Sequence, residues 1–341
     1  SSVAVVCGGK VMLFDCGEGT HRQILKCKKR VKFGRIGHVF ITHLHSDHVL
    51  GIFGLLNAMN FKSGKTKIHV VGPKGIKVLL ENVASATTSK MEHVRVTELS
   101  TEMKDTYDTE DDVKRVGNRA VNIELDGGMT VHARVIVHVE DLVTWGYVIA
   151  EGKAPGKLDV KKAKEMGASG RHFGMLKANQ PVTVNGRTIL PSQVLSSAKD
   201  GIKVSLLWDT SDPSNAKEAA TGSALMIHEA TYSNDLAKNV AKYGHSTAGM
   251  AGRFAQETRS KTLVLTHISS RFNDPRYDEK ELNPMTEALL KQAQEGAIEA
   301  GRKEDEQKGG VLPTRVLVAH DFLELERTAE DQFVPVEVAE S

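Results

Sequence analysis

The sequence predicts an α/β fold, and three observations lead to this prediction. Residues 1–85 alternate short apolar runs with helix-like segments, so strands and helices follow one another along the chain. The same alternation returns after Trp208. Apolar residues make up 40% of the 341 residues, which is enough for a large core. No apolar run reaches the ~18 residues that a membrane helix needs, so we expect no membrane-spanning segment.

The apolar runs also predict the order of the elements. A strand at 3–7 opens the chain without a preceding Met, as if in the middle of a structure, so we expect an N-terminal strand of the fold to be missing. The other predicted strands are 11–14, 39–42, 67–72, those within 121–139, 147–150, 204–208, 225–228, 262–266 and 316–319. The predicted helices are 21–28, 49–60, 76–84, 234–243, 247–257 and 284–300, with a charged loop at 301–310.

Three charged segments are expected within a single domain of residues 1–341. An acidic insertion is predicted at 88–118, where seven acids lie between Glu98 and Asp112, and a loose acidic tail at 326–341. Residues 153–199 are rich in Lys, Gly and Pro and lie between two predicted core strands. Their composition fits an extruded arm and an ordinary surface excursion equally well.

Charge and cysteine content exclude some classes of protein. The formal net charge of +2 argues against a polycation that coats nucleic acid indiscriminately, although residues 153–177 carry seven bases and only two acids. Cys7, Cys16 and Cys27 form neither a disulfide framework nor a metal knuckle. We therefore expect reduced thiols in an intracellular protein, whose compartment (cytoplasmic, nuclear or organellar) this sequence does not specify.

The strongest chemical signal is the segment His43-x-His45-x-Asp47-His48, which follows an apolar strand. In an extended loop, residues two apart point the same way, so His43 and His45 can bind one ion while Asp47 and His48 face a second. Imidazole nitrogens and carboxylate oxygens are ligands that zinc prefers. The segment predicts a metal site, and a polar surface loop is the weaker interpretation.

Two ions need more ligands than one loop supplies, and later strand ends offer them. Asp209 and His267 each follow an apolar run. A carboxylate at 209 can bridge two metals, although a turn or helix-cap Asp is the alternative. His138 also ends an apolar run, and His132 lies six residues earlier on the same expected strand face. We prefer His138 as the ligand and keep His132 in reserve.

Two further segments contain candidate proton-transfer groups. His228-Glu229-Ala230-Thr231 ends a strand, and His245-Ser246-Thr247 opens a helix. Glu229 can orient a histidine or be an ordinary loop acid. His245, taken alone, fits a surface residue better than a catalytic one.

Together these segments resemble the metallo-β-lactamase superfamily, and within it the tRNase Z family of tRNA 3′-processing endoribonucleases. The similar segments follow the chain in order: 14–20 (FDCGEGT), 43–48, 146–149 with 155–159, 228–231, 245–247, 265–271 and 319–322. The zinc loop alone identifies only the superfamily, whereas the HEAT and HST loops together with the arm point to tRNase Z. Trp208 departs from the pattern, because the family favours glycine there.

The resemblance implies a four-layer αββα sandwich with two zinc ions. One ion would be held by His43, His45 and His138, the other by Asp47, His48 and His267, and Asp209 would bridge them. Asp15 would buttress the metal loop. The residues expected to take part in catalysis are Asp47, His245, which would protonate the leaving oxygen, and Glu229, which would orient it.

The implied substrate is precursor tRNA, whose 3′ trailer would be removed to leave a tRNA 3′-OH and a trailer 5′-phosphate. RNA phosphates would be bound by basic side chains, namely Lys153, Lys157, Lys161, Lys162, Arg171 and Arg271. The resemblance also implies a homodimer. Two alternatives stay open: a hydrolase of the same fold acting on a small phosphodiester or other ester, and a degenerate, non-catalytic scaffold.

Overall fold

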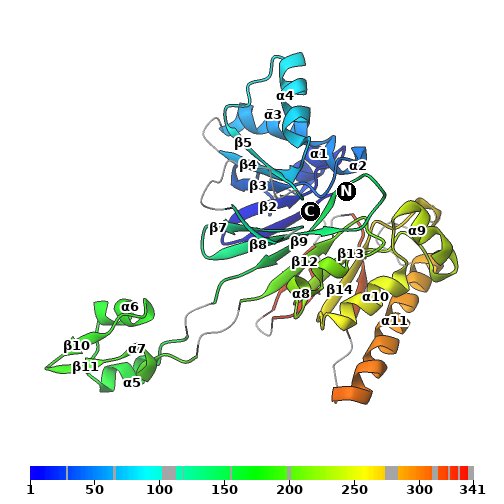
Figure 1. Ribbon diagram of the computed structural model, residues 1–341. Helices are drawn as coiled ribbons and strands as arrows, with labels where there is room; N and C mark the ends of the chain where they lie inside the picture. The colour runs from blue at the N-terminus through cyan, green and yellow to red at the C-terminus, as the bar shows by residue number, and fades with distance from the viewer. Residues whose placement is uncertain are drawn as a thin grey trace.

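Two β-sheets packed face to face organise the fold, and helices cover both outer faces (Figure 1). The computed structural model describes residues 1–27, 30–63, 67–101, 113–117, 119–153, 156–197, 201–272, 283–308, 314–321, 323–328 and 331–336. Within these ranges, no helix combines the length and apolar character needed to cross a bilayer.

The first sheet has five strands in the order β1-β2-β3-β4-β5. Their bounds are Val3–Cys7, Lys10–Phe14, Ile36–Phe40, Ile68–Pro73 and Val94–Leu99. β1 and β2 form an antiparallel hairpin, and the pairs from β2 to β5 are parallel. The connecting helices are α1 (Thr20–Lys26), α2 (Ser46–Val49), α3 (Ile52–Ser63) and α4 (Ile76–Ala86).

The second sheet has eight strands in the order β15-β14-β13-β12-β9-β8-β7-β6. In chain order they are β6 (Val113–Gly117), β7 (Ala120–Leu125), β8 (Met129–Ile136), β9 (Thr144–Ala150), β12 (Lys203–Leu207), β13 (Leu225–Glu229), β14 (Thr262–Thr266) and β15 (Arg315–Val318). The four strands from β12 to β15 are parallel, and the rest of the sheet is antiparallel.

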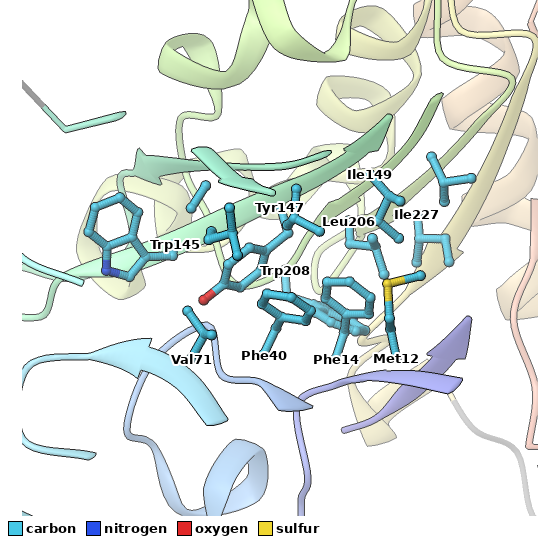
Figure 2. Close-up of a cluster of buried hydrophobic side chains, with 14 of the residues drawn as sticks. Met12, Phe14, Phe40, Val71, Trp145, Tyr147, Ile149, Leu206, Trp208 and Ile227 are labelled. Carbon is cyan, nitrogen blue, oxygen red and sulfur yellow. The ribbon is translucent and has the colours of Figure 1, made fainter. Parts of the chain in front are cut away.

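The core between the sheets follows from strand alternation, because successive side chains point to opposite faces. Met12 and Phe14 of β2 point into the inter-sheet core, whereas Val11 and Leu13 pack under the outer helices. Figure 2 shows the inner side chains of both sheets meeting, including Trp208. Trp208 stands where the tRNase Z family favours glycine. The inter-sheet core accommodates this larger side chain, which is only 1% exposed.

Helices complete the four layers. α1, α3 and α4 cover the first sheet with apolar side chains such as Ile24, Leu55 and Leu80. The second sheet is covered by α8 (Lys217–Ala220), α10 (Ala248–Glu257) and α11 (Pro284–Lys308). The expected αββα sandwich is therefore confirmed.

Residues 156–197 fold into a small unit that extends away from the two sheets (Figure 1). It contains α5 (Val160–Glu165), α6 (Arg171–Lys177), the hairpin β10 (Val182–Val184) with β11 (Arg187–Ile189), and α7 (Pro191–Val194). Its own apolar cluster includes Ala163, Leu176 and Ile189. We call residues 156–197 the arm; the sequence prediction of 153–199 missed its internal helices and strands, which are too short to show a clear period.

The structure differs from the sequence prediction at three other places. Part of the expected acidic insertion, 88–118, is ordered sheet, since β5 and β6 lie inside it; residues 102–112 fall outside the described ranges. Within the tail expected to be loose, 326–341, a hairpin pairs β16 (Leu325–Arg327) with β17 (Phe333–Pro335); residues 329–330 and 337–341 fall outside the described ranges. α11 continues through the expected loop to Lys308. Short 3-10 helices lie at Phe33–Arg35, Ser214–Ala216, Asn234–Asn239 and Ser270–Phe272, and α9 spans Val240–Tyr243.

Candidate metal centre

The candidate site lies where strands of both sheets end. Asp15 follows β2, and the loop 41–48 follows β3 in the first sheet. In the second sheet, His138 follows β8, Asp209 follows β12 and His267 follows β14. These strands run in the same direction within each sheet, so their carboxyl ends share one edge, the usual place for a site in such folds.

The loop 41–48 is fixed by hydrogen bonds to both sheets. The buried Asp15 carboxylate accepts from the backbone N–H of Thr42, from its hydroxyl (both 2.8 Å) and from Nδ1 of His48 (2.6 Å). From the other sheet, the backbone N–H of Trp145 donates to the carbonyl of Thr42 (2.9 Å), and the Tyr147 hydroxyl donates to that of Ile41 (2.7 Å). The loop is therefore held rigidly at the sheet interface.

One group of donor atoms combines His43, His45, His138 and Asp209, all within 4.8 Å of one another. Oδ2 of Asp209 lies 3.7 Å from Nε2 of His43 and 3.8 Å from Nε2 of His138. His138 is fixed by donating from Nδ1 to the carbonyl of Gly244 (2.7 Å). This set of three imidazoles and one carboxylate suits a borderline metal such as zinc.

A second group combines Asp47, His48 and His267. Oδ2 of Asp47 lies 3.2 Å from Nε2 of His48 and 3.6 Å from Nε2 of His267. Asp209 also faces this group, since its Oδ1 lies 3.4 Å from Nε2 of His267. Oδ2 of Asp209, which faces His43 and His138, is also 3.4 Å from Nε2 of His48 in the second group. Asp209 thus lies between the two groups, which is the placement that a bridging carboxylate requires.

The donor set fits a metal on a direct observation. Nε2 of His43, Nε2 of His48 and Oδ1 of Asp209 are buried and have no hydrogen-bond partner in the protein. Buried polar atoms are otherwise nearly always satisfied. The second nitrogen of each ring, Nδ1, is hydrogen-bonded to Thr42 or Asp15, which leaves the Nε2 lone pairs for a ligand.

The charge balance of the site also favours a cation. Burial of His43, reinforced by the nearby His48, lowers its pKa to about 2, so this ring is neutral, as a metal ligand must be. Burial would lower the pKa of His48 too, but the carboxylates of Asp15, Asp209 and Asp47 outweigh burial and raise it to about 11. The carboxylates around His48 therefore supply negative charge that a metal ion would neutralise.

His245 and Glu229 lie beside the two donor groups. Nδ1 of His245 is 3.0 Å from Oε1 of the fully buried Glu229, whereas His245 itself is 17% exposed. The ring of His245 packs 4.8 Å from that of His138 and 5.3 Å from that of His267. His245 also forms a possible third donor group with Asp209 and His267, so geometry alone permits either a ligand or an acid here.

Three residues of the site have backbone angles that side chains rarely adopt. Asp15, Asp209 and His267 have φ values of 56°, 27° and 52°, in the left-handed region. Such conformations cost on the order of 1–3 kcal/mol each and persist where the surroundings enforce them. Their clustering at strand ends of one site indicates that the fold positions these side chains at the expense of backbone strain.

The structure brings His138, and not the reserve His132, to the donor groups. β8 ends at Ile136, and Val137 pairs with Asp212 across an isolated bridge, so strand alternation does not extend to His138. His132 stays within β8, where its Nδ1 contacts Oδ1 of Asn122 (2.8 Å).

Of the expected RNA-binding side chains, only Arg271 lies beside the site, with its guanidinium 5.7 Å from the ring of Tyr232, which packs against His245. Lys157, Lys161, Lys162 and Arg171 are exposed on the arm, and Lys153 precedes it. The sequence analysis missed Thr42, Thr231 and Gly244, which orient histidines. Thr and Gly are common in loops, and only the position of Thr231, two residues after Glu229, gave a signal.

Comparison with known proteins adds evolutionary evidence. A family model for the anti-Pycsar protein Apyc1 matches residues 1–153. Ribonuclease Z of Salinibacter ruber is 32% identical over 286 residues, covering 82% of this chain and 83% of the relative. Ribonuclease Z of Bacillus licheniformis is 35% identical over 264 residues, or 77% and 79% of the two chains. The short form of human tRNase Z superposes with a TM-score of 0.57 at 22% identity, over 95% of this chain and 90% of that one.

The αββα sandwich, with His and Asp donors where its sheets meet, defines a protein of the metallo-β-lactamase fold. The fold protein YhfI of Bacillus subtilis superposes over 94% of this chain and 89% of its own, with a TM-score of 0.54 and 14% identity. The identity to two ribonuclease Z sequences over most of their length places the protein more narrowly: the chain belongs to the ribonuclease Z family.

Proposed function

We propose that this chain is a zinc-dependent endoribonuclease that removes the 3′ trailer from precursor tRNA, leaving a tRNA 3′-OH and a trailer 5′-phosphate. The observation that carries the proposal is the convergence of seven His and Asp donors, in two adjoining groups, in a chain of the ribonuclease Z family. The proposed ligands are His43, His45 and His138 for one zinc, and Asp47, His48 and His267 for the other, with Asp209 between them.

Zinc, when bound, would supply Lewis-acid chemistry that activates water and neutralises charge on the phosphate in the transition state. The chain's own residues would then serve the leaving group. Donation from Nδ1 of His245 to Glu229 fixes the ring and leaves Nε2 as the atom that can hand a proton to the ribose 3′-oxygen. Arg271, exposed beside Tyr232, would bind a phosphate near the cleavage point.

The arm would hold the RNA through its exposed bases, which suit the phosphates of a folded RNA. The arm leaves the second sheet where Ala150 of β9 pairs with Lys203 of β12. Asp209 lies beyond the other end of β12. A strand of five residues is roughly 17 Å long, so at least this distance separates the start of the arm from Asp209. An arm that starts at the edge opposite the site supports a homodimer in which each arm serves the partner's site.

Cleavage of a 3′-extended precursor tRNA, with both product ends mapped, tests the activity. We expect a cut that requires zinc, is lost on chelation and in His45→Ala, and leaves a 3′-OH and a 5′-phosphate. A small chromogenic phosphodiester is the parallel substrate. Turnover of that compound without any cleavage of RNA would contradict the tRNA assignment and favour a small-ester hydrolase of the same fold.

A mixing experiment tests the homodimer. One variant lacks residues 159–194 of the arm, and the other carries His45→Ala in the site; each alone should fail on precursor tRNA. If arms act across the dimer, mixing the two with subunit exchange restores cleavage, because one site is intact and faces an intact arm. Absence of restoration in verified mixed dimers would show that each arm serves its own subunit.

A further inference from the structure

One buried carboxylate, that of Glu229, contacts two histidines of the site by different routes. Its Oε1 accepts directly from Nδ1 of His245 (3.0 Å). Its Oε2 accepts from the hydroxyl of Thr231 (2.6 Å), and that same hydroxyl oxygen lies 2.9 Å from Nδ1 of His267. Thr231 is only 8% exposed, so water does not compete freely for these bonds. His267 is thus connected to Glu229 through a single hydroxyl group.

The direction of these bonds follows from the single proton of the hydroxyl. An oxygen 2.6 Å from a carboxylate oxygen must donate its proton there, in preference to the His267 carbonyl at 3.0 Å. The Thr231 oxygen therefore accepts from Nδ1–H of His267. This fixes the tautomer of His267 and leaves the Nε2 lone pair directed at Oδ1 of Asp209 (3.4 Å) and Oδ2 of Asp47 (3.6 Å).

The same arrangement occurs in the other sheet. The Thr42 hydroxyl donates to Oδ2 of the buried Asp15 (2.8 Å) and lies 2.9 Å from Nδ1 of His43. Nε2 of His43 is left without a partner, as a ligand atom should be. Carboxylate, threonine and histidine thus form a chain twice, once in each sheet and once for each donor group.

We propose that Thr231 and Thr42 are positioning residues, each of which fixes the tautomer and orientation of one metal-binding histidine. Thr231 does so for His267 and the second donor group, and Thr42 for His43 and the first. The inference rests on the proposed function, which supplies the two zinc ions. The two chains share no residue, although Asp15 of the Thr42 chain also accepts from Nδ1 of His48 in the second group. Each hydroxyl should therefore act mainly on the zinc that its own histidine binds.

The test removes each hydroxyl at nearly constant shape. Thr231→Val and Thr42→Val keep the side-chain volume, whereas Thr231→Ser and Thr42→Ser keep the hydroxyl. Thr258→Val is the matched control, because Thr258 is also fully buried but donates to helix carbonyls of Phe254 and Ala255, away from the donor groups. Zinc stoichiometry and the two dissociation constants are measured by competition with a chromogenic chelator, independently of any activity.

We expect both the wild type and Thr258→Val to bind two zinc ions. The two dissociation constants should be the same in Thr258→Val as in the wild type. Each Val variant should weaken one ion by about 10–100-fold, the usual effect of losing a partner that orients a ligand. Each Ser variant should restore the affinity. In the His45→Ala background, which keeps only the second donor group complete, adding Thr231→Val should weaken the remaining ion by much more than adding Thr42→Val does.

Several results would overturn the inference. They are wild-type zinc affinities in Thr231→Val, equal loss in Thr231→Ser and Thr231→Val, or equal effects of both Val variants in the His45→Ala background. If a Val variant does not fold, as judged by circular dichroism of the metal-free protein, the Ala variant takes its place with the same expectations. A wild type that binds two zinc ions but does not cut precursor tRNA would contradict the proposed function alone, and one that binds fewer than two would contradict both.

Discussion

Gly17 packs directly against the backbone of Asp47, so closely that a Cβ atom at residue 17 would overlap the Asp47 carbonyl oxygen. The neighbouring Cys16 reinforces this contact, since its N–H donates to the carbonyl of His48 (2.7 Å) and its carbonyl accepts from Gly51 (2.8 Å). The loop after β2 is therefore the support on which the loop 41–48 lies.

Gly17→Ala should displace Asp47 and His48, because the atom that a Cβ would overlap is a backbone oxygen and not the end of a flexible side chain. We expect weaker zinc binding and a lower melting temperature than in the wild type, measured by chelator competition and thermal unfolding. Gly54→Ala is the control, since a Cβ there meets nothing within 4 Å and alanine favours the α3 helix. Unchanged zinc affinity in Gly17→Ala would show that the loop can shift without affecting the donors.

Asp15→Asn should impair the metal site with little change of shape. Asp15 accepts three hydrogen bonds, and an amide would place a donor opposite a donor in at least one of them. We expect zinc affinity to fall by about 10–100-fold, together with the rate of precursor cleavage. Asp126→Asn, on an exposed turn paired with Lys10, should leave both quantities unchanged. Similar affinities for the two variants would remove Asp15 from the support of the site.

Replacing residues 159–194 by two glycines should separate RNA recognition from chemistry. Leu158 and Leu195 already pair across a bridge, so the shortened chain can close without disturbing β9 or β12. We expect turnover of a small phosphodiester to persist while precursor tRNA cleavage is lost. Leu176→Ala, which opens a cavity in the small arm core, should act in the same direction. Equal loss on both substrates would mean that the arm supports the fold instead.

The three thiols should differ in reactivity. Burial raises the pKa of Cys16 to about 12, so its thiol stays protonated and unreactive at neutral pH. Cys7 and Cys27 also have raised pKa values, from burial and from nearby glutamates, but both remain partly exposed. Alkylation of the native protein followed by peptide mass spectrometry should label these two first, and Cys16 only after unfolding. Early labelling of Cys16 would show that the loop after β2 opens readily.

The side chains that the sequence placed at strand ends as candidate donors do converge in the structure, because apolar runs followed by His or Asp are visible in one dimension. The choice between His138 and His132 was harder, since it depends on β8 ending at Ile136 before strand alternation reaches His138. The roles of the Thr42 and Thr231 hydroxyls could not be predicted, because each hydroxyl contacts a residue that is distant in the chain. This residue is Asp15 for Thr42 and His267 for Thr231.

The end of the last helix and the internal structure of the arm were not predicted correctly, and both have a physical reason. Gly301 suggested an end to the last helix, but one glycine costs only about 1 kcal/mol, and the Glu, Lys, Arg and Gln residues around it favour helix. In the arm, the helices and strands have only three to seven residues, which is too short for a clear hydrophobic periodicity. A small shared core stabilises them instead. Both features depend on tertiary context that composition does not reveal.

The donors come from both sheets: His43, His45, Asp47 and His48 from one, and His138, Asp209 and His267 from the other. Neither half of the sandwich carries all the proposed ligands of either zinc, so a nascent chain would complete the proposed metal sites only after both halves have docked. Metal uptake would then mark the end of maturation, and it would lock the docked halves together by mass action. A chain that fails to bring its halves together would stay metal-free and could not cut RNA prematurely.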